Sequence, residues 1–128
     1  MLTDQLVGSF RLVSLETRRG DGRVDRPMGD APTGLFMFGP DRHYSVQLGP
    51  DPTTDGAAMA YVAMWGTYSV DEQARTFTLT PDGALEPTLI GAPVLRHVEF
   101  RDGVAVFNTP PQVIDGVEAT TYITWRRV

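Results

Sequence analysis

Short runs of β-branched and aromatic residues, each closed by a turn signal, constrain the fold of this chain most. The sequence holds 13 glycines and 10 prolines, and most of them fall between runs rich in Val, Thr, Phe and Tyr. Such punctuation is typical of antiparallel strands that follow one another directly, as in an up-and-down barrel. A closed meander needs an even number of strands, so we count residues 84–90 as a strand and predict ten. Residues 3–7 are predicted to form a short helical turn with Thr3 as its N-cap.

The stretch 61–71 is predicted to be the central strand of an all-β domain that covers residues 1–128. It is uncharged up to its last residue and rich in β-branched and aromatic side chains. Gly66 in its middle indicates a sharp bend or the close approach of another group. We expect the other strands to wrap around this one and to enclose a pocket. Turns or loops are predicted at 20–22, 29–32, 39–42, 49–59, 81–83, 102–103 and 110–116.

Composition and charge argue against several classes of function. Cysteine is absent, which excludes disulfides and thiolate chemistry. The net charge is -5 with no basic run, so we expect no nucleic-acid partner. No apolar run approaches the roughly 20 residues of a membrane span, so we expect no membrane partner. The first residues lack the pattern of a secretion signal, and a cytoplasmic location is expected.

The turn at residues 39–42 sets a predicted register for the two strands around it. Pro40 and Asp41 suit the central positions of a type I turn, which puts Arg42 in a left-handed bulge position. Phe38 is then predicted to pair with His43. The side chains expected to share one sheet face are those of Phe36, Phe38, His43, Ser45 and Gln47.

An ordered set of short motifs, each weak alone, spans nearly the whole chain. In order they are Leu6-Val7-Gly8-Ser9-Phe10, Gly34-Leu35-Phe36-Met37-Phe38, Tyr44-Ser45-Val46-Gln47-Leu48, Gly66-Thr67-Tyr68-Ser69-Val70-Asp71, Glu86-Pro87-Thr88-Leu89-Ile90-Gly91 and Thr124-Trp125-Arg126-Arg127. The set resembles the bacterial and fungal lipocalin-like domain family. The resemblance implies a calycin-like barrel that binds a small hydrophobic ligand. Some lipocalin-like barrels of natural-product pathways act as cofactor-free cyclases or isomerases, so the resemblance also admits a polyketide-type substrate.

Two positions depart from the family pattern. The family often carries a His pair on the strand after the central one, where this chain has Leu79 and Thr80. Chemistry that depends on such a pair is therefore not expected. The family's glycine in the 39–42 turn is replaced here by Arg42.

The resemblance and period-two alternation together assign side chains to the barrel interior. The resemblance suggests that Phe10, Leu12, Tyr68, Arg96 and Trp125 point inward. Alternation adds Ser14, Glu16, Met64, Gly66, Val98, Phe100, Val104, Val106, Asn108, Thr121 and Ile123. Threading the strands up and down predicts a closed apolar end with Phe10, Phe100, Val104 and Trp125. The polar mouth at the other end is predicted to hold Glu16, Phe38, His43, Tyr68, Arg96, Asn108 and Thr121.

Three of these residues are candidates for catalysis. His43 is a possible general acid or base, or else an exposed residue beside a turn. Tyr68 is a hydrogen-bond donor to a ligand carbonyl, or else a packed core residue. Arg96 is an anchor for a ligand carboxylate or a stabiliser of an enolate, or else a structural arginine paired with Glu16 or a backbone carbonyl.

Three hypotheses follow for the function. The first is a cofactor-free cyclase or isomerase that uses His43, Tyr68 and Arg96. The second is a carrier or binding protein without catalysis, and the third is an interaction module whose barrel is filled by its own side chains. The residues predicted to contact a ligand are Glu16, Phe36, Phe38, Ser45, Met64, Asn108 and Thr121.

No metal or cofactor is predicted, because two histidines without cysteine and without His-x-His spacing make a poor ligand set. Trp65 is expected to point outward beside Tyr61, as part of a homodimer contact or under a loop cover. His97 is expected to face outward, because its neighbour Arg96 faces inward.

Overall fold

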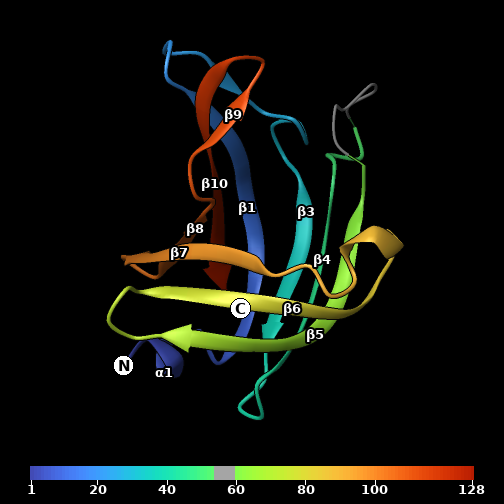
Figure 1. Ribbon diagram of the computed structural model, residues 1–128, viewed down its shortest axis with the longest axis vertical. Helices are drawn as coiled ribbons and strands as arrows, with labels where there is room; N and C mark the ends of the chain where they lie inside the picture. The colour runs from blue at the N-terminus through green and yellow to red at the C-terminus, as the bar shows by residue number, and fades with distance from the viewer. Residues whose placement is uncertain (54–59) are drawn as a thin grey trace.

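The computed structural model describes residues 1–53 and 60–128, and these residues form an antiparallel β-barrel (Figure 1). A single helix, α1 (Leu2–Leu6), opens the chain, and one 3-10 turn, η1 (Pro87–Leu89), follows the sixth strand. The strands are β1 (Gly8–Arg19), β2 (Val24–Asp25), β3 (Thr33–Phe38), β4 (His43–Gly49), β5 (Val62–Asp71), β6 (Thr76–Ala84), β7 (Val94–Arg101), β8 (Val104–Asn108), β9 (Gln112–Ile114) and β10 (Val117–Arg127). Most of the loop predicted at 49–59 lies outside the described residues.

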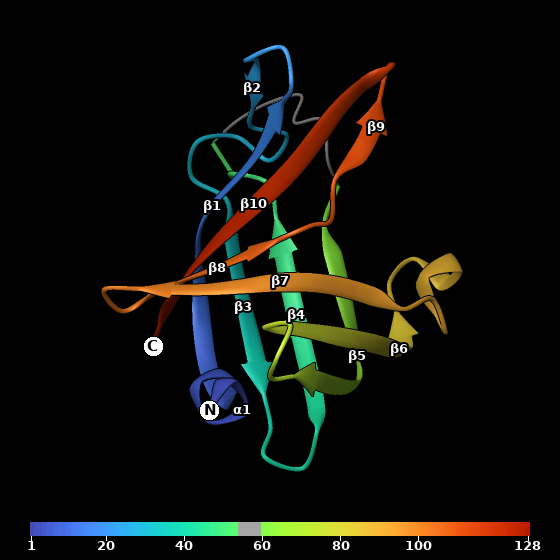
Figure 2. The ribbon, with the colours of Figure 1, turned by 60° about the vertical axis from the view of Figure 1, so that its left-hand side comes forward.

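Eight of the described strands close into a ring. The order is β1-β3-β4-β5-β6-β7-β8-β10, and β10 pairs back onto β1. Every neighbouring pair is antiparallel. The short strands β2 and β9 pair with β1 and β10, respectively, at one end of the barrel (Figure 2). The predicted all-β up-and-down barrel is confirmed, with ten strands of which eight form the wall. Closure pairs the edges that an open sheet would expose.

The strand predicted at 84–90 and the turn predicted at 81–83 are both wrong. Strand β6 runs through this turn to Ala84, and residues 87–89 form η1 instead. A bulge between Trp65 and Gly66 accommodates the extension. A Cβ atom added at Gly66 would lie 2.1 Å from the Thr80 carbonyl oxygen, so only glycine permits this close approach. The number of strands is still ten, because an additional short strand, β9, forms in the predicted loop at 110–116.

Helix α1 covers one end of the barrel, which we call the closed end. Leu2 and Leu6 are buried there and belong to the same hydrophobic cluster as Phe10. Thr3 was predicted as the N-cap, but the helix begins at Leu2 and Met1 occupies the N-cap position. The carboxylate of Glu72 serves instead, since its two oxygens accept hydrogen bonds from the backbone N–H of Leu2 at 2.6 Å and of Thr3 at 3.1 Å.

Aromatic side chains fill the barrel next to this end. The rings of Phe36 and Phe38 stack with centroids 4.2 Å apart, and Phe77 meets Phe107 edge to face at 5.0 Å. Offset and edge-to-face contacts of this kind add to the apolar burial. The half of the barrel next to α1 is therefore a packed core, which leaves the other half for a cavity.

None of the helices in the described part of the chain is both long enough and apolar enough to cross a lipid bilayer.

Candidate functional site

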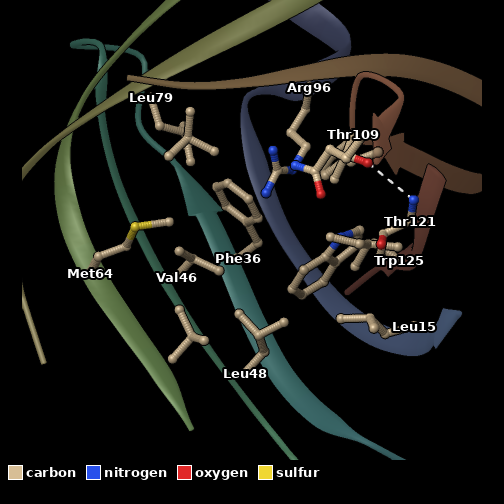
Figure 3. Close-up of a pocket in the computed structure, with 15 residues that line it drawn as sticks. Leu15, Phe36, Val46, Leu48, Met64, Leu79, Arg96, Thr109, Thr121 and Trp125 are labelled. Carbon is tan, nitrogen blue, oxygen red and sulfur yellow. Dashed lines mark hydrogen bonds between the residues drawn. The ribbon is translucent and has the colours of Figure 1, made fainter. Parts of the chain in front are cut away.

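A cavity of about 250 Å³ lies in the half of the barrel away from α1 (Figure 3). Each of the eight wall strands contributes at least one side chain to its lining. The apolar lining on the β3–β7 side consists of Phe36, Val46, Leu48, Val62, Met64, Leu79 and Val94. On the β1–β8–β10 side it consists of Leu15, Phe107, Ile123 and Trp125. The cavity is therefore an apolar chamber inside the ring of strands.

The polar lining residues gather on one side of the chamber. They are Arg96 from β7, Thr109 after β8, Gln112 from β9 and Thr121 from β10. The hydroxyl of Thr109 accepts a hydrogen bond from the Thr121 backbone N–H at 3.0 Å. The hydroxyl of Thr121 lies 2.9 Å from that of Thr17 on β1. Both threonine hydroxyls are therefore engaged within the barrel wall.

Arg96 brings a charge into this apolar chamber. Its Nη1 donates a 2.9 Å hydrogen bond to the carbonyl oxygen of Leu95. No acidic side chain among the described residues forms an ion pair with it, and Glu16, the partner weighed from sequence, binds elsewhere. Burial lowers the pKa of Arg96 below its ordinary value, although a guanidinium stays protonated in proteins. Arg96 points into the chamber, as predicted. It is a cation, and most of its N–H donors have no partner among the described residues.

Trp125 also lines this chamber and carries a second donor. Its side chain is 1% exposed, and its indole Nε1 has no hydrogen-bond partner among the residues that the structure describes. The hydroxyl of Tyr44 is also buried without such a partner, but Tyr44 does not line the cavity. Trp125 lines the cavity, although its predicted position was at the closed end and its N–H group was not predicted to matter. The inward alternation of Thr121, Ile123 and Trp125, which is correct, was the signal that could have revealed it.

The predicted inward orientation of Glu16 is wrong, because a bulge interrupts β1. The register between β1 and β10 shifts between Leu12 and Ser14, so Leu15 and Thr17 take the inner positions. Ser14 moves to the outer face for the same reason. The Glu16 carboxylate lies 2.8 Å from Arg18 and 3.8 Å from Arg26, outside the barrel.

His43 and Ser45 also lie on the outer face, together with Gln47. Arg42 adopts the predicted left-handed conformation with φ 70°. The loop is one residue longer than predicted, however, and Phe38 pairs with Tyr44 instead of His43. A shift of one residue exchanges the two faces of a strand. His43 is therefore 61% exposed, with Nδ1 3.3 Å from the Asp41 carboxylate.

Tyr68 and Phe38 point inward but lie at the closed end, and neither lines the cavity. The predicted strand directions count the residues between the turns at 20–22 and 29–32 as a strand of the wall. In the structure β2 only pairs with the end of β1 outside the ring, so β3, β4, β5 and β6 run opposite to the predicted direction. The mistaken strand at 84–90 reversed the count again, which is why Arg96 and Thr121 were predicted at the correct end.

Asn108 was predicted to face inward and does not. Phe100 pairs with Ala105 across the β7–β8 turn, and cross-strand partners share a face. Ala105, Phe107 and Thr109 consequently point inward, whereas Asn108 lies opposite His97 on the outer side. His97 is exposed, as predicted.

Four predicted site residues meet at the cavity: Phe36, Met64, Arg96 and Thr121. The proposed trio of His43, Tyr68 and Arg96 does not come together. The other eleven lining residues, among them Leu15, Thr109 and Gln112, were not predicted to contact a ligand. Over residues 1–53 and 60–128, no group of three or more His, Asp or Glu side chains is placed to hold a metal ion.

A protein-family model described as a lipocalin-like domain matches residues 7–128. No curated protein matches the chain.

Proposed function

Because the chain belongs to the lipocalin-like domain family, we propose that it binds a small, largely hydrophobic organic molecule inside its barrel. The family and the closed barrel are compatible with such binding. The observation that carries the proposal is the cavity of about 250 Å³, whose lining is apolar apart from one polar side. Chambers with an apolar lining and a few convergent polar groups are the usual form of small-molecule sites.

Cyclase or isomerase activity on a polyketide-type ligand is the second candidate function. The observation in its favour is the guanidinium of Arg96, which could stabilise the negative charge that develops on an enolate oxygen. Among the described lining residues, Arg96 is the only ionisable side chain. The described part of the cavity thus offers electrostatic stabilisation but no general base, and binding without catalysis is the better supported function.

Titration with 1-octanol, followed by calorimetry, tests the proposal. Val46→Phe should abolish binding, because the larger side chain fills the chamber from β4. Met37→Phe is the matched control, since Met37 is exposed on the outer face of β3. This variant should bind octanol as the native protein does. Absence of octanol binding to the native protein, or equal binding by both variants, would refute a ligand site in the barrel.

A cytoplasmic location and homodimer formation through the face around Trp65 stay predictions.

A further inference from the structure

We propose that the ligand is a carboxylate with an apolar body, and that its carboxylate accepts hydrogen bonds from Arg96 and Trp125. This inference rests on the proposed ligand site in the barrel and specifies the chemical class of its ligand. The two residues line the same chamber. Figure 3 shows the guanidinium of Arg96 extending from β7 into the chamber that Trp125 also lines.

The chamber has donors that its own residues do not satisfy. A guanidinium carries five N–H donors, and within residues 1–53 and 60–128 the side chain of Arg96 donates one hydrogen bond, to the Leu95 carbonyl oxygen. The indole of Trp125 is a donor only, and it is buried without a partner among the described residues. The threonine hydroxyls beside them are already engaged, because that of Thr109 accepts from the Thr121 backbone N–H and that of Thr121 pairs with the Thr17 hydroxyl on β1. A ligand that enters the chamber must therefore supply acceptors.

The charge of Arg96 selects an anion among possible acceptors. An alcohol or ketone would accept a hydrogen bond but would leave the positive charge uncompensated in an apolar environment. An amine would add a second positive charge. A carboxylate neutralises the guanidinium and matches its planar fork with two oxygen atoms.

The volume of the chamber limits the apolar body. An apolar cavity of about 150 Å³ is known to hold benzene. A chamber of about 250 Å³ then accommodates a ligand of about ten non-hydrogen atoms, by proportion to that case. Octanoate has this size, and 1-octanol is its uncharged analogue with the same carbon chain.

The two tryptophans of the chain permit a direct measurement. Trp65 lies on the outer face and is 55% exposed, so Trp65→Phe leaves Trp125 as the only indole, inside the chamber. Octanoate and 1-octanol are titrated into this variant at pH 7, and the Trp125 emission is followed. We expect octanoate to bind about tenfold more tightly than octanol or better, as a hydrogen-bonded charge pair allows.

Arg96→Met, made in the same background, tests the anchor. It should weaken octanoate binding about tenfold or more and leave octanol binding unchanged, which also shows that the variant is folded. Arg101→Met is the matched control, because Arg101 lies on the same strand but is exposed and pairs with Glu99. It should bind both compounds as the parent does.

The outcomes separate this inference from the proposed function. Octanol binding as tight as octanoate binding, unaffected by Arg96→Met, would overturn the carboxylate assignment and leave the apolar site intact. Binding of neither compound would overturn both. Equal loss of octanoate affinity in the Arg96 and Arg101 variants would also overturn the assignment, since it would reflect surface charge alone.

Discussion

The hydroxyl of Tyr68 donates a 2.6 Å hydrogen bond to the carbonyl oxygen of Gly39, and this bond connects β5 to the β3–β4 turn. The ring of Tyr68 also meets Phe38 edge to face, with centroids 5.1 Å apart. A tyrosine considered for catalysis thus has a structural partner for its only polar group. Its position at the closed end separates it from the cavity that Arg96 enters.

Tyr68→Phe should destabilise the protein by about 1 kcal/mol, because it removes the shorter of the two hydrogen bonds to the Gly39 carbonyl oxygen and leaves only the 3.3 Å bond from the Arg42 backbone N–H. Octanol binding should not change. Urea unfolding and calorimetric titration of the same preparation measure both effects. Weaker ligand binding at unchanged stability would show that Tyr68 acts on the ligand after all.

Arg96→Met should leave the melting temperature of the ligand-free protein unchanged or raise it. The substitution removes a half-buried charge that lacks an acidic partner among the described residues. Arg19→Met is the contrasting variant, because Arg19 forms a 2.7 Å ion pair with Asp25. The melting temperature of this variant should fall. A large fall for Arg96→Met in a thermal scan would mean that the guanidinium has a structural acceptor.

Glu72→Gln should lower the melting temperature at pH 7. Hydrogen bonds from the hydroxyl of Thr3 and the backbone of residues 2 and 3 lower the pKa of Glu72 below its ordinary value of 4.5. The folded state therefore gains stability from the ionised carboxylate above pH 4.5 and loses it as the pH falls below that value.

Thermal scans from pH 7 to pH 3 check this pH dependence. The difference between the native protein and Glu72→Gln should shrink below pH 4.5. Glu118→Gln, an exposed carboxylate of β10, serves as the control with little effect. A constant difference across the pH range would show that the charge of Glu72 does not secure α1.

Gly66→Ala should cost about 3 kcal/mol of stability, since the added Cβ meets the Thr80 carbonyl oxygen at 2.1 Å and forces the β5–β6 bulge apart. Gly20→Ala is the matched control, because its Cβ would lie 3.4 Å from the nearest backbone oxygen. Denaturant unfolding compares the two variants. Equal stability of both would mean that the bulge adapts to a side chain.

Trp65→Ala should weaken self-association without affecting octanol binding. Trp65 lies on the outer face of β5, and Tyr61 and Leu85 are also exposed. Sedimentation velocity over a range of concentrations measures the effect. A native protein that stays monomeric throughout would contradict the homodimer prediction.

Local signals predicted the elements of this fold well. Turn residues at 20–22 and 102–103 separate the strands as expected, and Gly66 marks the predicted close approach. Period-two alternation placed Arg96, Val98 and Phe100 inside, because β7 has no bulge in that stretch. These features depend on residues that are neighbours along the chain.

The errors in the candidate site come from small irregularities with long-range effects. One bulge in β1 turned Glu16 outward, and one extra residue in the 39–42 loop did the same to His43. The two-residue strand β2, counted as part of the wall, reversed the direction assigned to β3, β4, β5 and β6. None of these events has a distinct signal in the residue types alone.

The sequence by itself determined an antiparallel barrel with an apolar interior and an inward arginine on β7. Only the tertiary structure decided which side chains share the cavity, because membership depends on strand direction, register and bulges at once. Arg96 and Trp125 show the consequence. Their strands, β7 and β10, do not pair with each other, because β8 lies between them. Ring closure between β10 and β1 completes the wall of the chamber that both residues line.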